Sequence, residues 1–407
     1  MTKFRLAHLG LVMAAIGFTA AAPLAGLSSV AYAAETVRGE IGRPLQEAQK
    51  LAAAGKNKEA VAKLKETDSV GNKSANETYL IERTRASAAA SAGDYDTAAR
   101  AFESVINSGK LSAAEQPKFT QALAGIYYRI KDYPKAITWI QRALKDNPND
   151  NAMHELLIQT YYISGKYPEA AKELQSSKNL NEAQLGMLAN IQLKQNDKAG
   201  YVQTLERMAA SYPKPQTWAD LLQRVQAKPG FTPTLSLDIL RLRLANGLLT
   251  KPAEYMEMSQ LALQAGNAAE AIKIIDEGYK KGALGTGSDA ARHQRPKDLA
   301  AKNQAEFDAK LAANEAEAVK NKDADALANM GYALVSAGKA DKGLALMDQA
   351  VKLGTGKNPE AIKLHYGIAQ SVAGKKSAAV STLKSVKGTD GTADLARYWT
   401  LGLNKGA

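Results

Sequence analysis

The sequence predicts an all-α fold, an α-solenoid of stacked helix pairs. Three observations predict it: similar short turn sequences recur along the chain, apolar residues flank each turn at helical spacing, and the interval between turns is nearly constant. The turns begin at residues 55, 93, 131, 165, 196, 266, 338 and 374, so most steps are about 35 residues and two are close to double that value. Such an interval is typical of stacked supersecondary units.

Residues 117–150 illustrate one unit. An apolar stripe from Phe119 to Ile130 predicts a first helix, and a second stripe from Ala136 to Leu144 predicts a second helix. The turn at residues 131–134 ends in proline, which suits the first turn of a helix because its missing N–H has no partner there. Neither helix can bury its stripe alone, so the pairs must stack on one another.

These units resemble tetratricopeptide repeats, whose 34-residue pattern sets Leu-Gly, Tyr, Ala and Pro at fixed positions. The resemblance is strongest over residues 79–184, fair over 324–390 and weakest between 215 and 325. It implies a superhelical array of nine to ten helix pairs. The residues that carry it include Leu123, Tyr127, Ala136, Pro148, Tyr161, Ala170, Met330 and Gly331.

The two double intervals predict degenerate units. One unit is expected to turn near Gly230, between apolar stripes at Trp218–Val225 and Leu235–Leu244. In the other interval, Gly282–Gly287 and Arg295-Pro296 are expected to form a loop. One long helix over Pro296–Lys320 is then predicted.

The array is predicted to divide into an N-terminal lobe, residues 34–211, and a C-terminal lobe, residues 212–407. Proline-rich stretches near the boundary favour a hinge there. The last apolar stripe, Ala393–Leu403, predicts a C-terminal capping helix, because the exposed end of a solenoid has to be covered.

Residues 1–33 have the pattern of a secretory signal. A basic start, an apolar run over Leu9–Ala22 and the small residues around Tyr32 predict cleavage near Ala33 and a periplasmic protein. No later segment is apolar enough to predict a membrane span. The chain has no cysteine, so the sequence predicts neither disulfides nor a lipid anchor on a cysteine.

The charge balance is basic, with 53 Lys and Arg against 41 Asp and Glu. Removal of the signal takes away Lys3 and Arg5 and leaves 51 against 41, a net charge of +10. This excess favours an acidic partner. Because the lysines are dispersed and no aromatic residues alternate with them, nucleic-acid binding is not expected.

The sequence offers no catalytic, metal or cofactor site. His154 and His365 are expected to pack on helices, and His293 is expected to lie solvated in a loop. No histidine or carboxylate cluster has the spacing of a zinc site, and no nucleophile motif is present. An enzyme is therefore not expected; a hydrolase concealed in residues 280–325 is a minor alternative.

The resemblance also implies where a partner would bind, because first helices of tetratricopeptide repeats line a concave groove. Tyr128 and Tyr162 are 34 residues apart and are expected at equivalent places, with a core tyrosine before each. Tyrosine is favoured at binding hot spots. The predicted groove residues are Lys118, Gln121, Tyr128, Arg129, Glu155, Gln159 and Tyr162.

Two functions fit these expectations. The first is a non-catalytic periplasmic scaffold that binds another protein of the cell envelope, in envelope assembly, polysaccharide export or TonB-type uptake. The second is a carbohydrate- or peptidoglycan-binding module, in which the stacked tyrosines would lie against sugar rings. The identity of the partner is not encoded in any motif of the sequence.

Overall fold

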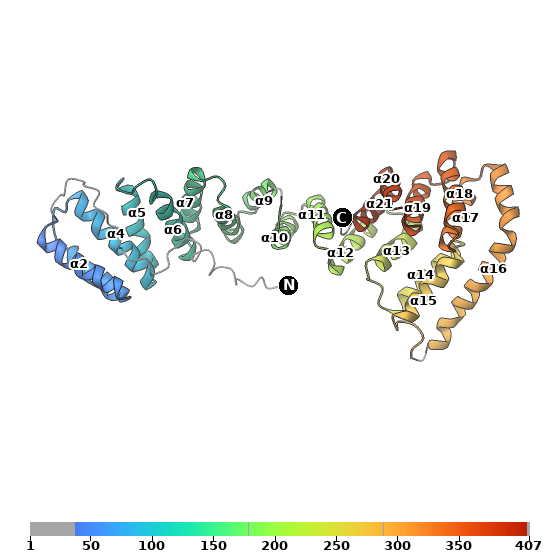
Figure 1. The fold of residues 1–407 in the computed structure, drawn as a ribbon, viewed down its shortest axis with the longest axis horizontal. Helices are drawn as coiled ribbons and strands as arrows, with labels where there is room; N and C mark the ends of the chain where they lie inside the picture. The colour runs from blue at the N-terminus through green and yellow to red at the C-terminus, as the bar shows by residue number, and fades with distance from the viewer. Residues whose placement is uncertain (1–36, 178, 288, 405–407) are drawn as a thin grey trace. The chain divides into compact units, whose positions relative to one another are not determined.

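The computed structural model describes residues 37–404 except 178 and 288. The predicted signal and its cleavage point lie outside the described residues. Within them the regular structure is entirely helical, with 20 α-helices and two short 3₁₀ helices, which confirms the predicted all-α solenoid class (Figure 1). The chain forms two compact units that divide between Leu180 and Asn181. The predicted boundary at 211/212 falls inside the second unit.

Unit 1 contains α2 (Gly39–Ala53), α3 (Asn57–Leu64), η1 (Lys65–Thr67), α4 (Ala75–Ala92), α5 (Tyr95–Asn107), α6 (Gln116–Arg129), α7 (Tyr133–Asp146), α8 (Asn151–Ile163) and α9 (Tyr167–Ser176). Unit 2 begins with α10 (Glu182–Lys194), α11 (Lys198–Ser211), α12 (Pro215–Gln226), η2 (Pro233–Leu235), α13 (Ser236–Ala245), α14 (Pro252–Gln264) and α15 (Ala268–Lys280). It continues with α16 (Ala290–Asn321), α17 (Ala324–Ser336), α18 (Ala340–Leu353), α19 (Pro359–Val372), α20 (Lys376–Lys384) and α21 (Thr392–Leu403).

Every turn predicted from the recurring signature contains a left-handed residue. The φ angle is positive at Gly55, Gly93, Lys131, Gly165, Asn196, Gly266, Gly338 and Gly374. Glycine and asparagine are the residues that adopt this conformation most easily. The signature therefore marks the end of each first helix, and the second helix begins within two or three residues.

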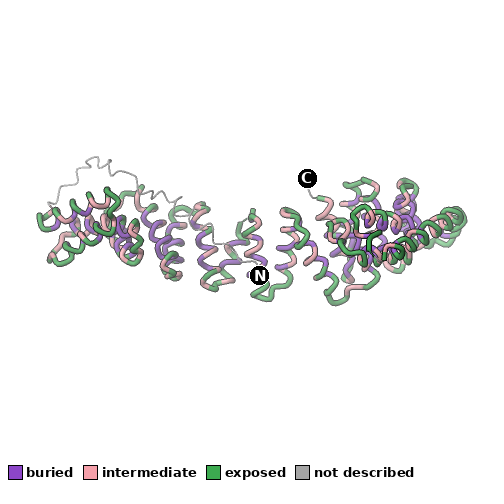
Figure 2. The backbone as a smooth tube through the Cα atoms, turned by 90° about the horizontal axis from the view of Figure 1, so that it is seen from below, coloured by how far each residue is buried: buried purple, intermediate pink, exposed green. Residues whose placement is uncertain are grey.

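Unit 1 is a serial stack. Each first helix packs on its own second helix, and each second helix packs on the first helix of the next pair. The small residues at the predicted crossing points, Ala98, Ala136 and Ala170, are fully buried, which allows the helices to approach closely. Figure 2 shows the buried positions as an inner stripe along these helices, with the exposed positions on the outside.

Unit 2 contains the predicted degenerate unit and the predicted long helix. The helices α12 and α13 flank a turn at Gly230, as expected. The helix α16 has 32 residues and starts at Ala290, before the predicted loop at Arg295-Pro296. That part of the loop prediction was wrong, because Pro296 is accommodated within the helix.

Unit 2 differs from a stack that continues in one direction, because its chain folds back on itself. The helices α11 and α13 contact α21, and α15 contacts α17, while α16 connects the two halves at the bend (Figure 1). One apolar core therefore joins residues as distant in sequence as Leu205, Trp218 and Tyr398. The predicted capping helix α21 does cover α19 and α20, and it also covers α11 and α13.

A buried charged network connects the two halves of unit 2. Arg241 on α13 donates two hydrogen bonds to Glu270 on α15, at 2.7 and 2.6 Å, and one to Asp238 at 2.7 Å. His365 on α19 is 3.0 Å from the other oxygen of Asp238, through its Nε2 atom. Tyr332 on α17 donates to Glu270 at 3.3 Å, and its ring lies 4.4 Å from the Arg241 guanidinium.

Asp238 is 1% exposed, so its charge depends on these partners. Burial alone would raise the pKa of the Asp238 carboxyl, but the charges of His365 and Arg241 outweigh burial and lower it to about 2. A buried carboxylate with a lowered pKa stabilises the fold above its ordinary pKa, and this contribution is lost as the pH falls towards 2.

A second set of contacts fastens the fold-back near the C-terminus. Lys228 pairs with Asp394 at 2.8 Å, and Arg397 pairs with Glu206 at 2.8 Å. The backbone N–H of Thr232 donates to the carbonyl of Asp390 at 3.0 Å. These contacts hold α21 and the residue Asp390 before it against α11 and the loop that follows α12.

Replacement of Asp238 by Asn is expected to lower the free energy of unfolding of unit 2 by about 3–5 kcal/mol at pH 7, because Arg241 loses a buried anionic partner. The difference from the unchanged protein should shrink as the pH falls from 4 towards 2, where Asp238 itself is protonated. Urea unfolding with hydrogen exchange of α13 measures both effects.

The matched control is Asp348→Asn, which removes an exposed ion pair with Lys352 and should lower the free energy of unfolding by less than about 1 kcal/mol. An equal cost for the two variants at pH 7 would contradict the network.

Replacement of Gly331 by Ala is expected to destabilise unit 2 by about 1–3 kcal/mol. A Cβ atom there would lie 2.5 Å from Met347 Cγ and 2.6 Å from the Gly343 carbonyl oxygen, where α17 and α18 cross. The control is Gly402→Ala in α21, which meets nothing within 4 Å and should stabilise by about 0.5–1 kcal/mol. Thermal unfolding of the two variants should show shifts of opposite sign.

Candidate functional site

The predicted groove residues lie on α6 and α8 of unit 1, and the two tyrosines have equivalent surroundings. Tyr128 packs edge-on against Tyr133 with ring centroids 6.1 Å apart, and Tyr162 packs edge-on against Tyr167 at 5.8 Å. The preceding tyrosines of each pair, Tyr127 and Tyr161, are buried in the core as expected. We call Tyr95, Tyr128, Tyr133, Tyr162 and Tyr167 the tyrosine ladder.

The members of the ladder differ in exposure. Tyr128 is only 8% exposed, and burial raises the pKa of its hydroxyl. Tyr133, Tyr162 and Tyr167 are half-buried, so each presents part of its ring to solvent. Tyr128 is therefore the buried member of the ladder, while the other tyrosines provide contact area that is both apolar and hydrogen-bonding.

Arg129 extends the ladder to the preceding helix pair. Its guanidinium lies 4.8 Å from the ring centroid of Tyr95, and its Nη1 atom donates to the Tyr95 hydroxyl. The Arg129 side chain remains exposed. A cation held over an aromatic ring in this way can still contact an acidic or carbonyl oxygen of a partner.

The other predicted groove residues have unequal roles. Gln121 donates to Asp150 at 2.6 Å, and Asp150 caps α8, so Gln121 joins two helix pairs rather than facing a partner freely. Lys118 and Glu155 are exposed, and Gln159 is half-buried with a weak hydrogen bond to Glu155 at 3.5 Å. The structure brings these residues onto neighbouring first helices.

Sequence reasoning missed three members of the ladder, Tyr95, Tyr133 and Tyr167. Each is the first residue of a second helix, two positions after the left-handed residue of its turn. The recurring signature already contained this position. What it could not show is that Tyr133 and Tyr167 contact the tyrosine three residues before their turn, or that Tyr95 contacts Arg129 of the next helix pair.

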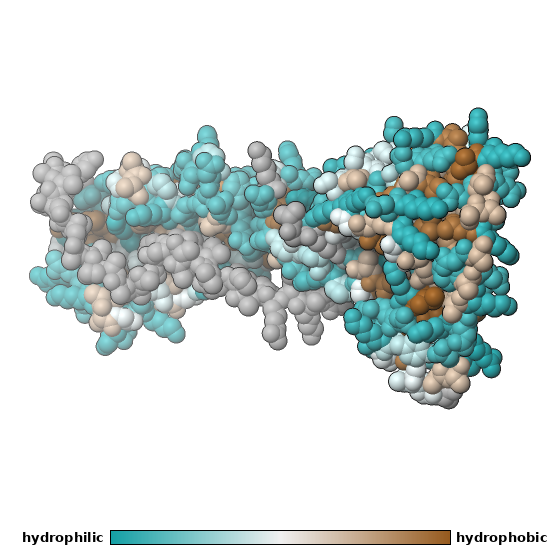
Figure 3. Space-filling view, turned by 45° about the vertical axis from the view of Figure 1, so that its right-hand side comes forward, coloured by the Kyte–Doolittle hydropathy of each residue, from teal (hydrophilic) through white to brown (hydrophobic). Residues whose placement is uncertain are grey.

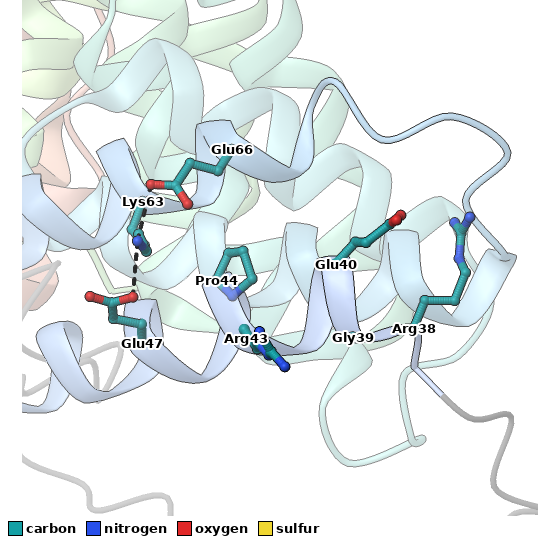
Figure 4. A pocket seen from close by; sticks show the side chains of 8 residues that line it. All are labelled: Arg38, Gly39, Glu40, Arg43, Pro44, Glu47, Lys63 and Glu66. Carbon is teal, nitrogen blue, oxygen red and sulfur yellow. Dashed lines mark ion pairs between the residues drawn. The ribbon is translucent and has the colours of Figure 1, made fainter.

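A polar hollow of about 970 Å³ lies elsewhere in unit 1, over α2 and α3. Figure 4 shows Lys63 between Glu47 and Glu66, with N···O distances of 2.9 and 3.1 Å. Arg38 pairs with Glu77 at 2.8 Å. Lys63, Glu47, Glu66 and Arg38 are thus paired within unit 1, and the hollow forms a polar outer face on α2 and α3.

The histidines make structural contacts. His154 links α8 to Glu173 of α9 and to the carbonyl of Pro148 at 2.8 Å. The prediction for His293 was wrong: it lies in α16, is 5% exposed, and accepts a hydrogen bond from the Gly285 N–H at 3.1 Å. His365 belongs to the buried charged network, which no sequence spacing indicated.

In the described part of the chain no group of three or more His, Asp or Glu side chains is placed to hold a metal ion. No helix among residues 37–404 combines the length and apolar character needed to cross a membrane.

Comparison with known proteins connects unit 1 to one family. Residues 83–151 match the tetratricopeptide repeat family, and this range includes α5, α6 and α7. No curated protein matches the sequence.

Two solved structures are similar at low identity. One is the structure of Naa15/Naa10 bound to HypK-THB, 14% identical over 85% of this chain, with a TM-score of 0.31; the match spans only 58% of that chain. Another is yeast Tom70, 11% identical over 80% of this chain and 96% of that chain, with a TM-score of 0.26. Similarity at this level says nothing about partners. The family match is confined to residues 83–151, and a left-handed residue recurs at the turns of the other helix pairs.

Proposed function

We propose that the protein is a non-catalytic scaffold that binds another protein of the cell envelope through the tyrosine ladder of unit 1. The repeats support the coarser part of the proposal, because this repeat class serves protein interaction by presenting extended surfaces. The finer part of the proposal, binding through this surface, is supported by four half-buried tyrosines, Tyr95, Tyr133, Tyr162 and Tyr167.

A periplasmic location is the second part of the proposal. It rests on the basic start, apolar run and small-residue cleavage pattern of residues 1–33. The absence of cysteine accords with a fold that does not depend on the redox state of its compartment. The net positive charge supports an acidic partner, with Arg129 as an exposed cation that contacts Tyr95 of the ladder.

The ladder also supports a second candidate function, the binding of a glycan. Aromatic rings that repeat from one helix pair to the next could lie against successive sugars, with Lys118 and Arg129 nearby for a polyanionic chain. Retention on immobilised peptidoglycan that is lost on Tyr162→Ala would favour this function over protein binding.

A photo-crosslinking amino acid at position 162 is expected to capture one defined envelope protein in cells. The same group at Thr138, an exposed position on the second helix α7, is the control and should capture none. Equal captured products from the two positions, or none from either, would contradict the proposal. Fractionation of the same cells tests the location, since the protein should leave with the periplasmic fraction.

Replacement of Tyr162 by Ala is expected to weaken the crosslinked complex at least about tenfold while leaving the fold intact, as expected of a binding hot spot. Replacement of Tyr128 by Ala should instead lower the free energy of unfolding of unit 1 by about 3–5 kcal/mol, because Tyr128 is buried. Urea unfolding and binding measured on both variants separate the two roles. A Tyr162→Ala variant that binds normally would remove the ladder from the proposal.

A further inference from the structure

The helix α16 stands where the repeat pattern would place a pair of helices. It has 32 residues, so it is about 48 Å long. One face packs on α14 and α15 and then on α17, and His293, Ala300 and Ala318 are buried there. No second helix among the described residues of unit 2 covers the opposite face.

Ala309 lies at the middle of this opposite face, which is exposed along its whole length. The residues along its midline are mostly small: Ala305, Ala309, Ala313 and Ala316. Two large apolar side chains flank the line, Leu299 at 50% exposed and Val319 at 43% exposed. Figure 3 shows a line of weakly hydrophobic side chains along this side of unit 2, with hydrophilic side chains on both sides of it.

The charges of α16 fall into two groups. Lys297, Asp308 and Glu315 are engaged by neighbouring helices, with Asp276, Lys339 and Lys342 at 2.5, 2.8 and 2.7 Å. Three acidic and four basic side chains remain on or beside the exposed face without an ion pair in the described structure. Arg295 lies near the start of the helix, and the other six are Asp298, Lys302, Glu306, Lys310, Glu317 and Lys320. Asp298 accepts only a hydrogen bond from Gln294.

The order of the four outer charges, Asp298, Lys302, Glu317 and Lys320, is self-complementary. Asp298 precedes Ala309 by eleven residues and Lys320 follows it by eleven. Lys302 precedes it by seven and Glu317 follows it by eight, while Glu306 and Lys310 lie close to the centre. If two copies of the helix run antiparallel and cross at Ala309, Asp298 meets Lys320 of the other copy and Lys302 meets Glu317. Near the axis, Lys310 lies two positions from Glu306 and two positions from Lys310 of the other copy, so the central pair favours neither arrangement.

We propose that α16 forms an antiparallel pair with α16 of a second copy of this chain. The second copy supplies the covering helix that this repeat lacks. A two-fold axis through Ala309 makes the same patch meet itself, as in most protein dimers. Small side chains at the centre let the helices approach closely, and the four outer charges set the direction and register of the pair. A parallel pair would place like charges together.

The oligomeric state of the purified protein tests the proposal. Sedimentation velocity over a concentration series should show a monomer–dimer equilibrium, weakened by increasing salt. Ala309→Glu would place two like charges face to face at the axis and should raise the dimer Kd on the order of a hundredfold. Ala345→Glu in α18 puts the same change at another exposed helical alanine and should leave the Kd unchanged.

A charge reversal tests the register. Lys302→Glu and Glu317→Lys should each raise the Kd on the order of tenfold, because each places like charges together at two symmetric places. The double variant restores opposite charges and should regain most of the affinity. If these charges acted only within one chain, the double variant would not regain the affinity of the dimer.

The outcomes are distinct. The proposal would be overturned if the protein remained a monomer at every concentration of the sedimentation series. A dimer that Ala309→Glu leaves intact, or single variants that the double variant does not rescue, would also overturn it. Circular dichroism on each variant confirms that the helices remain folded. The partner-binding test on Tyr162 is independent, because that residue lies in unit 1.

Discussion

A helix hairpin buries its apolar stripes only when another hairpin covers each side of it, and this requirement governs both units. Unit 1 meets it by serial stacking, and its first pair presents a charged outer face in which Lys63, Glu47 and Glu66 satisfy one another. Unit 2 meets it differently. Its chain folds back, so that α21 covers α11 and α13 as well as α19 and α20.

The fold-back brings charged side chains into the interior of unit 2. Asp238, Arg241, Glu270 and His365 come from three helices that are distant in the chain, and each has a partner of suitable geometry. Burying such charges adds little stability by itself, because desolvation opposes the attraction. Its effect is on specificity: any shift of α13 against α19 would leave a buried charge without its partner.

The two units therefore differ in the surface that they leave for binding. In unit 2, residues from α13, α15, α17 and α19 contact one another, so those faces are occupied by the protein itself. In unit 1, the tyrosine ladder is partly exposed, and Arg129 lies over Tyr95 with its charge towards solvent. This contrast is the reason to place partner binding in unit 1 and to seek self-association on the outer face of α16.

Local patterns in the sequence determined the helices, their order and their turns. The recurring signature predicted eight turns, and each contains a left-handed residue: seven are glycine or asparagine, which adopt this conformation easily, and the eighth is Lys131. The same spacing placed Tyr128 and Tyr162 at equivalent positions. The direction of stacking was decided only by the tertiary structure, since the contacts of α21 with α11, and of His365 with Asp238, join residues more than a hundred positions apart. Periodicity specifies which face of a helix is apolar, but not which distant helix will cover it.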